Sequence, residues 1–332
     1  MRELPLSVLD VAPVAASGST GEALRHTTEL ARRVEALGYR RFWVAEHHNM
    51  PAIASSSPAV LLAHLAAATS TIRVGSGGVM LPNHAPLVVA EQFGTLEALH
   101  PGRIDLGIGR APGTDQHTAL ALRRTMEGLS AENFPQELQD LIAYFEGDTR
   151  ILASPGKGSK PDVWLLGSSG FSAQLAGLLG LPFAFAHHFS AQNTLPALGL
   201  YRQHFRPSQW LTEPYVMVAV SAVAAETDEE AEFLSGPSDL SFLRLRSGRP
   251  EPLATPEEAA AYPYSARERE FALSRREGQA LGSPATVRRQ LTDLLAATQA
   301  DEFMLTCMVY DIEARARSFE LIRNEVAPAL TK

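Results

Sequence analysis

The sequence predicts an α/β barrel in which strands and helices alternate and the functional side chains collect at one end. Eight short apolar runs are typical of strands, and segments with helical periodicity separate them. Several of these runs end in small, polar or charged residues, such as Gly109 and Arg110 after residues 104–108. In such a barrel the carboxyl ends of the strands converge on one mouth, where the chemistry of this fold takes place. We therefore expect an enzyme.

The elements alternate along the whole chain. The expected strands cover residues 4–9, 42–45, 72–76, 104–108, 163–166, 183–186, 215–221 and 302–306. The expected helices cover residues 21–37, 58–69, 86–99, 172–179, 285–297 and 313–327. Gly38 ends the first helix, Ser283 and Pro284 form an N-cap and first-turn pair, and Pro328 follows the last helix.

Two stretches interrupt the alternation. Residues 111–135 follow the fourth strand, and residues 235–282, rich in Pro, Arg and Glu, follow the seventh. Long insertions after barrel strands often form lids or substrate walls, and a solvated excursion is the alternative. We treat residues 1–332 as one barrel domain that carries both insertions.

The composition is that of a globular, acidic chain. Its 332 residues are 45% hydrophobic and 20% charged, which provides enough apolar material for a large core. The formal net charge is -8 and no basic run is present, so neither nucleic acid nor an anionic membrane is expected as a partner. Small molecules are the expected ligands.

Cysteine content and the N-terminus indicate the compartment. The single cysteine, Cys307, excludes an internal disulfide and a multi-cysteine zinc site, which fits a reducing environment. Because it ends an apolar strand, we interpret it as a buried hydrophobic side chain. The first ten residues lack the apolar core of a signal peptide, and no run of eighteen apolar residues is found. The sequence thus predicts a cytoplasmic protein.

Glu46, His47 and His48 follow the second strand. Neighbouring residues at a strand end point to different sides, so one histidine is expected to face the mouth. There it could exchange protons near neutral pH while Glu46 orients it, and a hydrogen-bonded structural histidine is the alternative. A metal site is a weaker alternative without a carboxylate set at ligand spacing. It would draw on the histidines after the third and sixth strands, His84, His187 and His188.

Glycines end the third and fourth strands. Those at residues 75–78 allow a flat ligand to approach the backbone, or a bulge to turn the chain. Residues 107–110 lack the third glycine and the following helix of a dinucleotide-binding fingerprint. Arg110 is better explained as the ligand of an anion such as phosphate, with a surface salt bridge as the alternative.

Three serines, Ser168, Ser169 and Ser172, lie where the fifth strand leads into a helix. The free N–H groups of a helix N-terminus and nearby hydroxyls form a phosphate cradle, whereas ordinary helix capping is the alternative. Arg110 on the neighbouring strand end adds weight to phosphate binding.

Residues 44–115 and 165–189 together resemble the bacterial luciferase-like family of flavin-dependent monooxygenases, and the likeness extends from residue 4 to about residue 328. The resemblance implies a (β/α)₈ TIM barrel with the flavin ring in its mouth. It also implies FMN as the cofactor, usually in a reduced form that a separate flavin reductase supplies. A homodimer through residues 58–69 and 86–99 is likewise implied, and packing of these helices only against the barrel is the alternative.

The resemblance also suggests roles for individual residues. His47 matches the candidate catalytic histidine and Glu46 the acidic residue beside it. Gly77 and Gly78 match a pair that a non-proline cis peptide joins beneath the ring. The phosphate-contacting positions of the family correspond to Arg110, Ser168, Ser169 and Ser172.

The implied reaction is the oxidation of a small organic substrate by reduced FMN and O₂, by way of a flavin hydroperoxide. The luciferase catalytic subunit has a reactive thiol in place of Gly109 and an acidic residue in place of Ser168, so light emission with long aldehydes is not implied. Two alternatives stay open. One is a deazaflavin-dependent hydride-transfer enzyme on the same barrel, and the other is a non-catalytic flavin-binding partner subunit.

Overall fold

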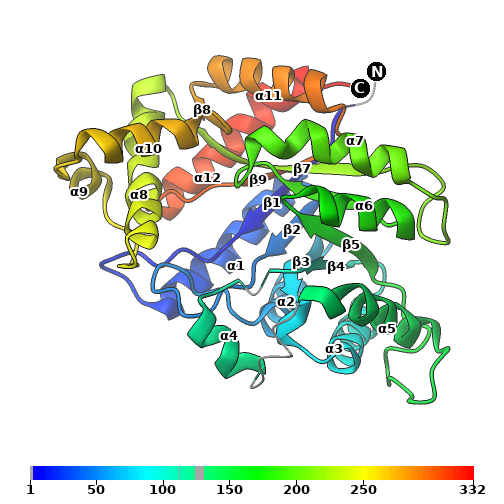
Figure 1. Ribbon diagram of the computed structural model, residues 1–332. Helices are drawn as coiled ribbons and strands as arrows, with labels where there is room; N and C mark the ends of the chain where they lie inside the picture. The colour runs from blue at the N-terminus through cyan, green and yellow to red at the C-terminus, as the bar shows by residue number, and fades with distance from the viewer. Residues whose placement is uncertain (1–2, 112, 124–130) are drawn as a thin grey trace.

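The computed structural model describes residues 3–111, 113–123 and 131–332, and its centre is a closed barrel of eight parallel strands (Figure 1). The barrel strands are β1 (Leu6–Asp10), β2 (Arg41–Val44), β3 (Arg73–Met80), β4 (Ile104–Gly109), β5 (Asp162–Gly167), β6 (Phe183–Ala186), β7 (Val216–Ala224) and β9 (Glu302–Thr306). β1 to β7 pair in order, and β9 lies between β7 and β1 and closes the ring. The predicted (β/α)₈ barrel is confirmed.

A ninth described strand, β8 (Gln279–Gly282), lies outside this ring. It pairs with the far end of β7, from Ser221 to Ala224, and of these residues Ser221 also pairs with β9. The sequence analysis missed this strand and placed its residues in the second insertion. Its sequence, Gln-Ala-Leu-Gly, lacks the apolar run that identified the equally short strands β2 and β6.

Helices surround the barrel, as Figure 1 shows. Those of the described residues are α1 (Thr20–Ala36), α2 (Pro58–Ala68), α3 (Pro86–Leu99), α4 (Gln116–Arg123), α5 (Phe134–Glu146), α6 (Gly170–Leu179), α7 (Thr194–His204), α8 (Asp228–Arg246), α9 (Pro256–Ala261), α10 (Ala266–Arg276), α11 (Pro284–Thr298) and α12 (Ile312–Leu321). Gly38, with φ +79°, follows α1, and Ser283 caps α11 ahead of Pro284, as predicted.

The structure describes the two predicted insertions to different extents. In the first, α4 and the start of α5 are described, whereas residues 112 and 124–130 lie outside the described residues. The second contains helices, and its first helix, α8, already begins at Asp228 because Thr227 accepts a hydrogen bond from the N–H of Glu230. We call α8, α9, α10 and the loops between them the lid.

The lid has its own apolar core and is tied to the barrel loops. Leu240, Leu243 and Ala259 are buried against one another within it. Leu253 bonds by its backbone to the loop after β1: its N–H donates to Val14 O at 2.8 Å, and its carbonyl accepts from Ala16 N at 2.8 Å. The lid is therefore held at the carboxyl end of the barrel, where the mouth lies.

A buried ion network closes the other end of the barrel interior. Arg41, at the start of β2, donates two hydrogen bonds of 2.8 Å to Asp105 of β4 and bonds Glu302 of β9 at 3.1 Å. All three side chains are at most 3% exposed. Trp43 Nε1 donates to Asp105 at 2.8 Å, and its ring packs edge-to-face on Trp164 above the ions. The barrel interior is thus polar at the amino ends of the strands and apolar towards their carboxyl ends.

Replacing Arg41 by Met should strongly destabilise the fold. The change leaves Asp105 and Glu302 as buried carboxylates without their central cation, and removing one partner of a buried ion pair costs about 3 to 5 kcal/mol. Urea unfolding followed by circular dichroism measures the loss.

Arg317→Met is the matched control for Arg41. Arg317 pairs with Glu226 and Glu320 while 49% of its side chain is exposed, and such a surface pair contributes about 1 kcal/mol or less. Equal losses in the two variants would show that the network does not hold the barrel together.

Candidate active site

A cavity of about 290 Å³ opens at the carboxyl ends of the strands, beneath the lid. Side chains from the barrel interior form its floor, among them Leu9, Trp43 and Leu166. Ser238, Phe242 and Leu245 of α8 face it from the lid. The sequence analysis predicted the mouth as the site, and the structure has its largely apolar cavity there.

Methionines make up much of the apolar lining. All five methionines of the described residues face the cavity: Met50, Met80, Met217, Met304 and Met308. Thioether side chains are unbranched and polarisable, so they adapt to ligands of irregular apolar shape. The sequence analysis did not identify this lining, because the five residues are far apart along the chain.

The glycines of β3 and β4 allow two backbones to come unusually close. The Gly77–Gly78 peptide is cis, as the resemblance implied, and the β3–β4 register shifts at this point, so the predicted bulge is present as well. A Cβ on Gly78 would lie 2.8 Å from Gly107 O, and one on Gly107 would lie 2.1 Å from Ser76 O. Side chains are excluded here, and Gly77 presents bare backbone to the cavity.

His47 faces the cavity from the loop after β2. Its Nδ1 lies 3.4 Å from Gly113 O, and a carbonyl accepts only from a protonated nitrogen, which leaves Nε2 as an acceptor in the neutral ring. Burial lowers the pKa of His47, although the Gly113 carbonyl and the charge of Glu46 act in the opposite direction. A neutral, proton-accepting ring is therefore the stable form at neutral pH.

Glu46 does not line the cavity but lies fully buried beside it. Its carboxylate bonds His48 Nε2 at 2.9 Å, Asn83 Nδ2 at 3.0 Å and the N–H of Met80 at 2.9 Å. Burial alone would raise the pKa of Glu46, but hydrogen bonds from His84, Asn83 and His48 outweigh it and hold the pKa below its ordinary range. The carboxylate thus joins the loops that follow β2 and β3.

His188 also lines the cavity, from the loop after β6. Its Nδ1 is 3.0 Å from Ala219 O, so Nδ1 carries the proton and Nε2 is free of it in the neutral ring. Burial lowers the pKa of His188 to about 4, and the charges of His187, Arg275 and His47 add to this effect. The sequence analysis weighed His188 only as a metal ligand.

Metal binding finds no support among the described residues. His84 bonds Glu46, and His187 bonds Thr194 Oγ1 at 2.7 Å, so the histidines considered for a metal lie in different clusters. No group of three or more potential ligand side chains with suitable geometry occurs in the described part of the chain. Cys307 is buried in the apolar core, as expected, and burial raises the pKa of its thiol to about 11.

Arg110 extends into the cavity from the end of β4. Its guanidinium carbon lies 4.4 Å from the ring centroid of Phe171, in the first turn of α6. No carboxylate of the described residues pairs with it, so the surface salt bridge considered as an alternative is not found there. This cation is held beside the N-terminus of α6 with its charge free to meet a ligand.

The serines converge on the same corner. Ser168, Ser169 and Ser172 all line the cavity, and Ser169 is the N-cap of α6 without making a side-chain capping bond. No acidic residue occupies the first turn of α6. The ordinary capping role is therefore not used at Ser169, and the N–H groups of the first turn lie together with Arg110 and three hydroxyls.

The fold and this mouth define a (β/α)₈-barrel enzyme with a buried apolar cavity. The chain belongs to the luciferase-like monooxygenase family, whose model matches residues 4–302, and the protein is thus a monooxygenase.

Relatives match along nearly the whole chain. A luciferase-like monooxygenase of Escherichia coli strain K12 is 47% identical over 323 residues, which cover 96% of each chain. The N-acetyl-S-alkylcysteine monooxygenase of Bacillus subtilis is 34% identical over 333 residues, which cover 98% of each. The crystal structure of apo-MsnO8 is 40% identical, with a TM-score of 0.91 over 99% of each chain.

More distant structures share the fold alone. The oxygenating constituent of 3,6-diketocamphane monooxygenase, solved in complex with FMN, has a TM-score of 0.75 at 20% identity over 99% of each chain. An F420-dependent secondary alcohol dehydrogenase has a TM-score of 0.69 at 14% identity over 100% of each chain. The same barrel thus occurs with both kinds of cofactor. Among the described residues, no helix has the length and apolar character needed to span a membrane.

His188 should make the fold sensitive to acid. The pKa of His188 is about 4 in the folded chain against about 6.5 when exposed, so between these pH values the unfolded chain binds a proton that the folded chain does not. Acid then favours unfolding, by about tenfold in the unfolding equilibrium per pH unit from this side chain. Urea midpoints at pH 7, 6 and 5 should fall less steeply in His188→Gln than in the wild type.

His26→Gln is the control for this measurement. His26 lies exposed on α1, outside the cavity, and the same substitution there controls for the change of residue type. Identical pH profiles for the wild type and His188→Gln would contradict the prediction.

Proposed function

We propose that the protein is an FMN-dependent monooxygenase that uses reduced FMN and O₂ to oxidise a small organic substrate in the barrel mouth. The observation that carries this proposal is the corner formed by Arg110 and the N-terminus of α6. A cation without a carboxylate partner among the described residues, three serine hydroxyls and free helix N–H groups meet there. This combination suits a phosphate group.

The remainder of the cavity fits a flavin. The bare backbone of Gly77 and the apolar floor around Trp43 suit a flat ring, while Arg110 and the serines would hold the phosphate at the rim. The FMN complex of 3,6-diketocamphane monooxygenase supports FMN, whereas the F420-dependent alcohol dehydrogenase keeps the deazaflavin alternative open.

Bound reduced FMN would supply two electrons and the activation of O₂. The chain's own residues would prepare the surroundings. The lid and the methionine-rich lining would exclude water, which protects reactive species from side reactions. His47 would hold or accept a proton at Nε2, and Glu46 would fix the loop that carries His47, as a positioning residue.

The partners remain predictions. A flavin reductase would supply reduced FMN, and the name of the relative from Bacillus subtilis agrees with a small organic substrate. A homodimer through α2 and α3 is supported by apolar side chains on their outer faces, because Val60 is 73% and Val88 44% exposed. The cytoplasmic location is likewise a proposal from the sequence.

Reduced FMN should bind in a way that depends on its phosphate and on Arg110. In anaerobic titrations, Arg110→Gln is expected to weaken the binding of reduced FMN about tenfold, because a charge-assisted contact to phosphate is lost. Riboflavin has the same ring without the phosphate, and Arg110→Gln should change its affinity less than about twofold.

An oxygen pulse then separates the cofactors. Protein loaded with reduced FMN should consume O₂. Arg317→Gln, at an exposed arginine of α12 that does not line the cavity, serves as the control for FMN affinity. Preferential binding of a reduced deazaflavin over reduced FMN would instead indicate a deazaflavin-dependent hydride-transfer enzyme. Equal losses for FMN and riboflavin in Arg110→Gln would refute the assigned phosphate site.

His47→Gln should keep FMN affinity but change how the bound cofactor reacts. In the wild type, the rate at which O₂ oxidises bound reduced FMN should fall as pH drops through a pKa below 6.5, because protonation removes the acceptor at Nε2. The variant lacks this titrating ring, so its rate should be low and show no such inflection. Stopped-flow absorbance at several pH values checks this, and a wild-type profile in the variant would exclude the role of His47.

A further inference from the structure

A second arginine reaches the cavity from the lid. Arg275, in the last turn of α10, lines the cavity while only 15% of its side chain is exposed. Its guanidinium carbon lies 3.4 Å from the ring centroid of Phe242, on α8, so the group is stacked on an aromatic ring that faces the same cavity. The stacking fixes the orientation of the guanidinium.

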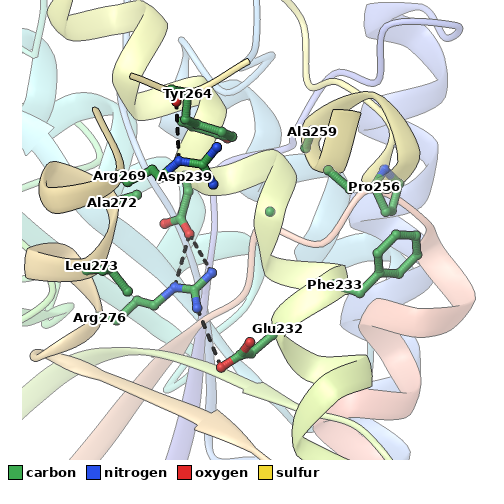
Figure 2. A pocket seen from close by; sticks show the side chains of 12 residues that line it. Glu232, Phe233, Asp239, Pro256, Ala259, Tyr264, Arg269, Ala272, Leu273 and Arg276 are labelled. Atoms are coloured by element: carbon green, nitrogen blue, oxygen red, sulfur yellow. Dashed lines mark hydrogen bonds and ion pairs between the residues drawn. The ribbon is translucent and has the colours of Figure 1, made fainter. Parts of the chain in front are cut away.

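The charge of Arg275 is only partly balanced within the lid. Its nearest carboxylate is Asp239, at 3.5 Å. Asp239 is bonded more closely by Arg276, at 3.2 and 3.3 Å. Arg276 also forms an ion pair with Glu232 of α8, as Figure 2 shows. One buried carboxylate is thus shared by two guanidinium groups, and its nearer partner is Arg276.

The cavity itself offers no negative charge to Arg275. Among the described residues that line it are Arg110 and Arg275 but neither an aspartate nor a glutamate. The lining thus carries positive charge although the formal net charge of the chain is -8. Burial lowers the pKa of Arg275 to about 10, against the charge of Asp239, and the group remains a cation at neutral pH.

The two arginines belong to different sectors of the mouth. Arg110 follows β4, whereas Arg275 lies on α10, which follows β7 and leads into β8. Arg275 is close enough to His188, after β6, for its charge to affect that ring. A phosphate at Arg110 and the serines would therefore leave Arg275 available to a second anion.

We propose that Arg275 binds the carboxylate of the substrate, and that the substrate is a small organic acid with an apolar chain. This inference rests on the proposed function for the assignment of Arg110 to the cofactor. The fork of a guanidinium matches a carboxylate with two parallel hydrogen bonds. Methionines on the cavity floor, such as Met217 and Met304, provide the apolar surface for the chain of the acid, directed towards the barrel interior.

The test compares an acid with its neutral amide. (Butylthio)acetate and (butylthio)acetamide have the same apolar chain, and calorimetry measures the binding of each to the full-length protein with and without FMN. The wild type is expected to prefer the acid about tenfold, as one charged hydrogen-bonded contact allows. Arg275→Gln should abolish this preference, with amide affinity changed less than about twofold, and Arg275→Lys should restore part of it.

Arg276→Gln is the matched control. It removes the neighbouring guanidinium from the same Asp239, but Arg276 lines the groove between α8 and α10 and not the mouth cavity (Figure 2). It should keep the preference for the acid. Loss of the preference to the same extent in both variants would overturn the proposal, since Arg275 would then act only through lid packing.

Two further outcomes are decisive. Equal affinity of the wild type for acid and amide, or a preference that Arg110→Gln abolishes in the presence of FMN while Arg275→Gln does not, would overturn the assignment to Arg275. FMN titration of the same variants tests the proposed function separately. If FMN does not bind while the acid preference still depends on Arg275, the cofactor assignment fails and the carboxylate site stands.

Discussion

The buried guanidinium of Arg41 is the interaction on which the arrangement of the barrel depends. It joins β2, β4 and β9, strands that are not neighbours in the ring, through Asp105 and Glu302. Charges at this depth are tolerated only when every partner is in place, so the network defines one end of the interior as polar and filled. Trp43 and Trp164 cover the ions, and the space above them at the carboxyl ends is left for ligands.

Much of the fold and part of the site could be predicted from the sequence, since both depend on local patterns. Apolar runs that end in glycine or serine located the barrel strands and the corner of Arg110. Arg41 and Asp105 could not be recognised, because a charged residue inside a strand has meaning only through partners far away in the chain. The same reason applies to Arg275, whose role depends on how the lid folds back over the mouth.

The site separates residues that face the cavity from residues that hold them in place. Glu46 was expected among the catalytic residues, but its buried carboxylate is hydrogen-bonded to four neighbouring groups and does not line the cavity. His47, in contrast, faces the cavity. Likewise the ring of Phe171 stacks on the guanidinium of Arg110, and the ring of Phe242 stacks on that of Arg275. Both cations are thereby oriented by aromatic rings. Arg275 also donates one long hydrogen bond, of 3.5 Å, to Asp239.

The methionine lining has a consequence for the lifetime of a monooxygenase. A thioether is readily converted to a sulfoxide, which is polar and chiral where the original side chain was apolar. An oxidant released in this mouth is in contact with lining methionines such as Met80 and Met308. Each oxidation would make the lining more polar and less suited to an apolar substrate. The enzyme would therefore lose activity by damage that starts in its own active site, at a rate set by the fraction of turnovers in which oxidant is released without oxidising substrate.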